Sequence, residues 1–116
     1  MIEAYIYTSC TSCRKTVDRL KASGVPFESR DYFRNRFTRN ELEGVLAKAG
    51  LIPREVLSKR SKVYQARSAE IDGLDDDALL DLMLQEPTLL RRPIVIKDGA
   101  VVIGHNEGEL ASLITS

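Results

Sequence analysis

Two cysteines near the start of the chain, Cys10 and Cys13, have the spacing C-x-x-C. The thiolate form of cysteine attacks disulfides and oxyanions, so a reactive cysteine needs a pKa below its ordinary value of about 8.5. Cys10 comes just before a predicted helix, where unpaired backbone N–H groups and the helix dipole stabilise an anion. Arg14 and Lys15 add positive charge in the first turn of that helix. We therefore predict that Cys10 attacks and that Cys13 resolves the adduct as a disulfide.

An incidental pair of cysteines and a zinc site are the alternatives to redox chemistry. Free cysteines are common in protein cores, so two of them can fall three residues apart without a shared role. A zinc site needs two more ligands, and the sequence has His105 as its only histidine and no second cysteine pair. We expect no metal. Redox chemistry is favoured because the pair stands where a predicted strand passes into a predicted helix.

The charge and apolar content of the chain limit its partners and location. The 116 residues include 17 basic and 17 acidic ones, so the formal net charge is zero. That balance disfavours direct nucleic-acid binding, which needs a basic excess on one face. No apolar run approaches the roughly 18 residues that span a bilayer, and the N-terminus lacks the pattern of a signal peptide. We expect no membrane association and a cytoplasmic protein, and structural disulfides are rare in that compartment.

The first 30 residues or so have the pattern of a β-α-β unit. Residues 4–7 are aromatic and β-branched, as in a buried strand, and the apolar positions that follow recur at helical spacing until Gly24 and Pro26. Val25 to Arg30 is a second predicted strand. The cysteine pair therefore lies at the junction between the first strand and the helix.

The middle of the chain is predicted to be helical. Thr38 and Glu41 have the spacing of a capping box, followed by an apolar stripe that ends near Gly50. Pro53 to Leu57 and Ser61 to Arg67 are predicted as short helical segments. A further helix is expected from the acidic run at residues 75–77 until Pro87.

The last part of the chain is predicted to be β-β-α. Pro93 to Lys97 and Val101 to Gly104 flank Asp98-Gly99, a hairpin turn signal. A helix from Glu107 to Ile114 follows. The whole order predicts an α/β, thioredoxin-like fold: a four-stranded mixed sheet with a helical insertion at about 38–90, in a single domain over residues 1–116.

Arg92-Pro93 and Arg60 are further candidates for the site. In a thioredoxin-like fold the proline that opens the third strand is commonly cis and lies beside the reactive cysteine. Arg92 would then point toward the thiolate, and its planar guanidinium suits an oxyanion. Arg60 is a second candidate for the same role. Taken singly, each arginine is more often a solvated surface charge.

Several segments of the sequence resemble the ArsC/Spx family, and they span nearly the whole chain in the family's order. These segments are YTSCTSCRK (7–15), SKRSKVY (58–64), LLRRPIVI (89–96) and IGHNE (103–107). In wording they are most similar to the Spx regulators of the family.

The resemblance to Spx regulators implies a disulfide switch at Cys10 and Cys13, to which Arg92 would respond. It also implies binding to the C-terminal domain of the RNA polymerase α subunit. A glycine that Spx proteins use in that contact falls at Ile52 here, and the nearest glycine is Gly50. A bulky side chain obstructs docking where two backbones approach closely.

The resemblance to arsenate reductases of the same family implies a different role. In those enzymes one cysteine, which matches Cys10, attacks arsenate. Glutathione with glutaredoxin, or thioredoxin, would then serve as the reductant, and no cofactor stays bound. Two oxyanion-binding arginines would be Arg60 and Arg92, and a third falls at His105. These reductases usually lack the cysteine that matches Cys13.

We therefore expect a cytoplasmic protein with a reversible Cys10–Cys13 disulfide. A redox-responsive regulator that acts through RNA polymerase, together with redox partner proteins, is the first hypothesis. An arsenate reductase-like thiol oxidoreductase is the alternative. Arg14, Pro93 and His105 are expected to support the site.

Overall fold

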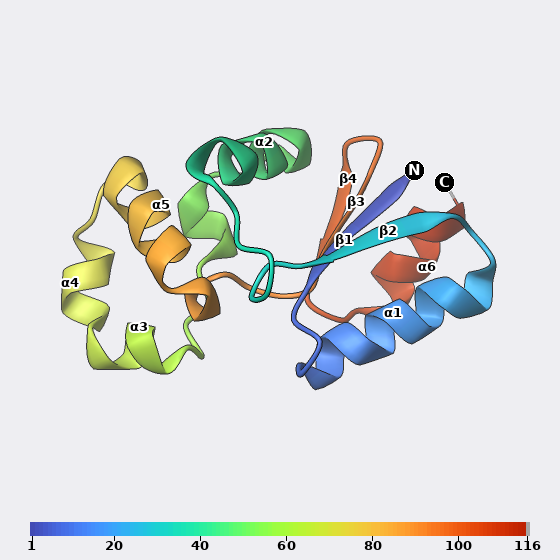
Figure 1. The fold of residues 1–116 in the computed structure, drawn as a ribbon, viewed down its shortest axis with the longest axis horizontal. Coiled ribbons are helices and arrows are strands. Elements are labelled where there is room, and N and C mark those ends of the chain that lie inside the picture. The colour runs from blue at the N-terminus through green and yellow to red at the C-terminus, as the bar shows by residue number, and fades with distance from the viewer. Residues whose placement is uncertain (116) are drawn as a thin grey trace. The chain divides into compact units, whose positions relative to one another are not determined.

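The computed structural model describes residues 1–115. Its contacts divide the chain into two compact units, and Figure 1 shows the elements of both. The first unit comprises Met1–Asn35 and the chain from Arg92 on, and the second comprises Arg36–Arg91. The expectation of a single domain stays a prediction. Among the described residues, no helix has the length and apolar character needed to cross a membrane.

The first unit contains a mixed sheet with the strand order β2-β1-β3-β4. Its strands are β1 (Ile2–Ile6), β2 (Phe27–Asp31), β3 (Ile94–Lys97) and β4 (Ala100–Ile103). Strand β1 runs parallel to β2 and antiparallel to β3, and β3 pairs antiparallel with β4. The predicted α/β fold with a four-stranded mixed sheet is therefore confirmed.

Two helices of this unit, α1 (Thr11–Ser23) and α6 (Glu107–Thr115), pack together beneath the sheet (Figure 1). Alternate residues of β1 face them, because successive strand side chains point to opposite faces. The core so formed consists of Ile2, Ala4, Ile6, Cys13, Leu20, Val95, Val102, Leu110, Leu113 and Ile114. Cys13 thus belongs to the packed interior, and α1 is held on the sheet by its own apolar stripe.

Local signals explain where these elements begin and end. Gly24 ends α1 with a φ of 73°, a left-handed conformation that glycine adopts without steric cost. Strand β2 starts at Phe27, two residues later than predicted, because Pro26 has no N–H to donate to β1. The β3–β4 turn has positive φ at both Asp98 and Gly99, as a two-residue hairpin turn requires.

The second unit is helical. Its elements are α2 (Arg39–Ala49), η1 (Pro53–Val56), α3 (Lys62–Ala66), α4 (Ser68–Asp72), α5 (Asp76–Gln85) and η2 (Pro87–Leu89). The predicted capping box is present: the Thr38 hydroxyl accepts from the Glu41 N–H at 3.2 Å, and the Glu41 carboxylate accepts from the Thr38 N–H at 2.9 Å. The sequence patterns did not predict α4. It follows α3 after one non-helical residue, Arg67, with φ −131° and ψ 28°.

Candidate functional site

Cys10 occupies the N-cap of α1. Its backbone is extended, with φ −86° and ψ 126°, and its carbonyl accepts the N–H of Arg14 at 3.0 Å. The Cys10 N–H donates to the Tyr7 carbonyl at 2.9 Å, which ties the residue to the end of β1. The predicted position just before the helix is therefore the observed one. The sulfur faces the backbone N–H groups of the first helical turn, which have no partner within the helix.

The surroundings of Cys10 lower the pKa of its thiol below the ordinary value. Burial acts in the opposite direction, because it disfavours the charged form. It is outweighed by hydrogen bonds from the backbone N–H groups of Ser12 and Cys13, by a hydrogen bond with the Cys13 side chain, and by the positive charge of Arg92. Cys10 is thus the more acidic of the two thiols.

Cys13 has the opposite character. Its side chain is 0% exposed, and burial raises the pKa of its thiol to about 12. The hydrogen bond to Cys10 and the charge of that neighbour contribute to this rise, whereas the Tyr7 N–H, which lies 3.4 Å from the Cys13 sulfur, opposes it. At neutral pH Cys13 therefore stays protonated and donates its S–H to Cys10.

Arg92 and Pro93 lie at the start of β3, next to the cysteines in the first unit. The peptide bond between them is cis. The charge of Arg92 acts on both Cys10 and Cys13 and lowers the pKa of each. Its Nε is buried, and no described residue supplies it with a hydrogen-bond partner. The structure therefore brings Cys10, Cys13 and Arg92 together, as the thioredoxin-like fold led us to expect.

Three aromatic residues that the sequence patterns did not single out surround Arg92. Tyr7 and Phe33 stack with ring centroids 3.9 Å apart and planes at 18°, and the ring of Tyr32 lies 5.1 Å from that of Phe33. The guanidinium carbon of Arg92 lies 5.7 Å from the Tyr7 ring centre and 5.4 Å from that of Phe33. Burial raises the pKa of Tyr32, although the charge of Arg92 and a hydrogen bond with Arg92 act to lower it. No regular spacing links these positions, so only the fold reveals the cluster.

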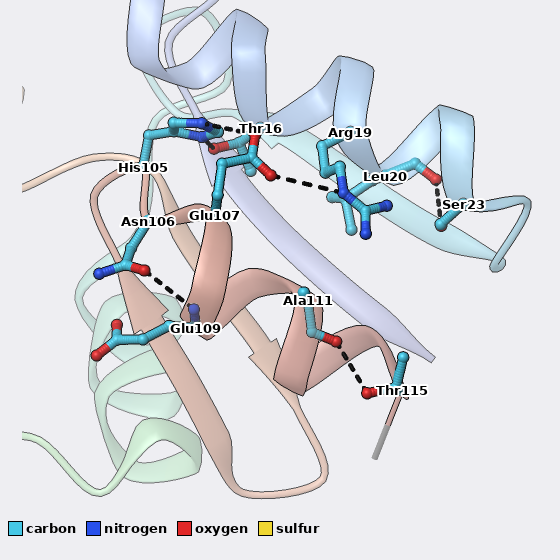
Figure 2. Close-up of polar contacts among 10 residues, drawn as sticks. All are labelled: Thr16, Arg19, Leu20, Ser23, His105, Asn106, Glu107, Glu109, Ala111 and Thr115. Atoms are coloured by element: carbon cyan, nitrogen blue, oxygen red, sulfur yellow. Dashed lines mark hydrogen bonds and ion pairs between the residues drawn. The ribbon is translucent and has the colours of Figure 1, made fainter.

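His105 lies in the turn between β4 and α6, where it connects that turn to α1 (Figure 2). Its Nδ1 is 2.9 Å from the hydroxyl of Thr16, and its Nε2 is 3.2 Å from the Glu107 carboxylate. The other oxygen of Glu107 lies 3.6 Å from Nε of Arg19 on α1. His105 is thus the centre of a polar network that links two helices.

Arg14 and Arg60, the remaining predicted site residues, have different settings. Arg14 is exposed and donates to the Ser9 carbonyl at 3.4 Å. Arg60 belongs to the second unit, where its exposed side chain lines a cavity of about 380 Å³ with Lys59 and Arg91. Within residues 1–115, no cluster of three or more His, Cys, Asp or Glu residues is arranged to hold a metal ion.

Comparison with known proteins gives consistent matches. The regulatory protein MgsR of Bacillus subtilis is 40% identical over 109 residues, which cover 94% of this chain and 86% of that protein. The global transcriptional regulator Spx 1 of Lactococcus lactis is 38% identical over 114 residues, 98% of this chain and 89% of that one. A putative arsenate reductase from Yersinia pestis shares the fold, with a TM-score of 0.82 at 23% identity over 97% of this chain and 99% of that one. The model of the ArsC family matches residues 5–113, and the chain belongs to that family.

Proposed function

We propose that this protein is a thiol-disulfide redox protein with a reversible Cys10–Cys13 disulfide. The observation that carries the proposal is the opposite character of the two thiols at the start of α1. Cys10 is half-buried and its thiol pKa is lowered, whereas Cys13 is buried and protonated, and the two share a hydrogen bond. A thiol of lowered pKa that ionises more readily, beside a resolving thiol that stays protonated, is the arrangement that favours disulfide formation.

Oxidation by a peroxide would proceed in two balanced steps. The Cys10 thiolate attacks one peroxide oxygen, the O–O bond breaks, and Cys10 becomes a sulfenic acid while hydroxide leaves. The Cys13 sulfur then attacks the Cys10 sulfur, its proton joins the departing hydroxyl group, and water leaves as the disulfide forms. A dithiol of the thioredoxin or glutaredoxin class, or glutathione, would return both thiols.

Mass spectrometry of the peroxide-treated protein without reductant tests this redox premise. One equivalent of hydrogen peroxide should remove two hydrogens from the protein and leave no titratable thiol. Cys13→Ser should stop at the sulfenic acid, and Cys10→Ser should react far more slowly. Two free thiols in the treated wild-type protein would overturn the proposal.

We further propose that the disulfide controls binding to RNA polymerase through the C-terminal domain of its α subunit, in a cytoplasmic regulator. MgsR and Spx 1 are both named as regulators, and their similarity to this protein extends over nearly the full chain, which supports this role. Calorimetric titration of the α-subunit domain with oxidised and reduced protein is the test. The affinities of the two forms should differ, and Cys13→Ser should behave as the reduced form after peroxide treatment. No binding by either form would refute the proposed regulatory role.

An arsenate reductase-like activity is a second candidate, favoured by the position of Arg92. Its buried Nε has no partner among residues 1–115, and its charge acts on Cys10, so an oxyanion at Cys10 would find a donor there. Reduction of arsenate with glutathione and glutaredoxin, coupled to oxidation of NADPH by glutathione reductase, is the assay. A rate no higher than that of Cys10→Ser would rule this activity out.

A further inference from the structure

The guanidinium of Arg92 rests against the stacked rings of Tyr7 and Phe33, here called the aromatic pair. The two rings come from segments that are far apart in sequence: Tyr7 follows β1, and Phe33 follows β2. The two rings pack face to face, with their centroids 3.9 Å apart and their planes at 18°. The guanidinium carbon lies at 5.7 and 5.4 Å from the two ring centres, within the roughly 6 Å at which a cation is attracted to an aromatic ring.

An arginine side chain needs such support to keep one position. Its several rotatable bonds give it high rotamer entropy, which favours a spread of conformations. Hydrogen bonds usually fix the group, yet the buried Nε of Arg92 has none from the described residues. The hydrogen bond with Tyr32 restrains one end of the guanidinium, and the two rings of the aromatic pair lie within 6 Å of its carbon atom and limit where it can move. The two rings therefore restrain the guanidinium of Arg92, for which no hydrogen bond at Nε from residues 1–115 does so.

The position of Arg92 matters because its charge acts on Cys10. Interaction between charges weakens with distance, and it weakens more when water enters between them. A guanidinium that leaves the aromatic pair for solvent therefore stabilises the Cys10 thiolate less.

We propose that Phe33 and Tyr7 are positioning residues for the reactive thiol, because they hold the Arg92 guanidinium where its charge stabilises the Cys10 thiolate. The inference rests on the proposed function, since it concerns the reactivity of the same cysteine. Phe33 is the residue to test. The backbone of Tyr7 also donates to the Cys13 sulfur, so a substitution there changes two interactions at once.

The test compares Phe33→Leu with three further variants. Phe33→Tyr keeps the ring and should retain the wild-type behaviour. Phe33→Met keeps an apolar side chain of similar length without a ring, and it replaces Phe33→Leu if that variant folds poorly. Phe27→Leu is the matched control, since it removes a half-buried ring from β2 on the same side of the core as α1.

The first measurement is the rate of Cys10 alkylation by iodoacetamide across pH, with fragment-ion mass spectrometry to separate the two cysteines. In Phe33→Leu and Phe33→Met, the rate below the thiol's pKa should fall about threefold, the lower range of a cation–π interaction. Phe33→Tyr and Phe27→Leu should match the wild type. Equal rates in Phe33→Leu and Phe27→Leu would overturn the inference.

The second measurement follows Arg92 itself. Ring currents should shift the NMR signal of its Nε–H in the wild-type protein and in Phe33→Tyr, and this shift should shrink in Phe33→Leu. An unchanged signal would also overturn the inference. The proposed function fails separately: if wild-type Cys10 reacts no faster than an ordinary thiol, the redox premise is wrong whatever Phe33 does.

Discussion

The hydroxyl of Thr16 lies 2.9 Å from Nδ1 of His105, so a residue of α1 is bonded to the turn that precedes α6 (Figure 2). Thr16 is 1% exposed and lies three residues after Cys13 on the same helix face. A buried hydroxyl needs a hydrogen-bond partner, and a ring nitrogen from the far end of the chain supplies one. This contact restrains α1, the helix that contains Cys13 and has Cys10 as its N-cap.

Replacing Thr16 by valine should therefore destabilise the first unit. The substitution keeps the side-chain shape but leaves Nδ1 of His105 facing an apolar group. The free energy of unfolding should fall by about 1–2 kcal/mol, the usual cost of an unpaired buried polar group. Urea denaturation measures it. Thr115→Val, which removes an exposed hydroxyl from α6, is the control and should change stability by less than about 0.5 kcal/mol. Equal losses in the two variants would contradict the structural role of the contact.

Stability should decrease in alkaline solution because of Cys13. The thiol pKa is raised above its ordinary value to about 12 in the folded protein. The unfolded chain therefore loses this proton first, and stability that is complete below pH 9 declines as the pH rises toward about 12. Cys13→Ala should show a shallower decline of the unfolding free energy over that interval, although its absolute stability is lower. Parallel curves for the two proteins would contradict the raised pKa.

Removing the charge of Arg92 should slow the reaction of Cys10. Arg92→Gln takes away a cation that lowers the thiol's pKa, and the alkylation rate near neutral pH should fall on the order of fivefold, about 1 kcal/mol of charge interaction. Arg14→Gln is the matched control, because Arg14 is exposed and donates to the Ser9 carbonyl. We expect the smaller effect there. A larger effect in Arg14→Gln would show that Arg14, in the first turn of α1, supplies the stabilising charge.

Ile52 should limit binding to the α subunit of RNA polymerase. Its side chain is 50% exposed at the start of η1, where the resemblance to Spx regulators implies a glycine in the contact. Ile52→Gly should tighten binding on the order of tenfold, equivalent to about 1.4 kcal/mol of relieved obstruction. Titration calorimetry measures this change.

Ile52→Ala shows whether a gain in affinity comes from close backbone approach or only from a smaller side chain. Alanine keeps the Cβ atom, so it should recover less affinity than glycine if close backbone approach is required. Equal affinities for the wild-type protein and Ile52→Gly would show that this position lies outside the contact.

The sequence was sufficient to predict the fold and the placement of the cysteines, because those signals are local. The apolar spacing after Cys10, the left-handed glycine at residue 24 and the Asp98-Gly99 turn each act through neighbouring residues. The capping box at Thr38 is local in the same way. Two short elements were not predicted: α4, which one residue, Arg67, separates from α3, and the 3₁₀ turn η2, which begins at the proline predicted to end the preceding helix.

The chemical setting of the cysteines depended on the tertiary structure. Cys10 and Cys13 are three residues apart and look equivalent in the sequence, but the core buries Cys13 and leaves Cys10 at the helix start. Their pKa values therefore move in opposite directions. Burial raises the pKa of Cys13, whereas hydrogen bonds and the charge of Arg92 lower that of Cys10.

The partners of Arg92 and His105 were also decided by the tertiary structure. Phe33 reaches Arg92, and Thr16 reaches His105, across 59 and 89 positions of the chain. No periodic pattern encodes contacts over such separations, because they arise only when the sheet brings β1, β2 and β3 side by side. The sequence thus determined which thiols are present and where they lie along the chain. The packed sheet decided which of them is the more acidic and which residues surround the charge beside it.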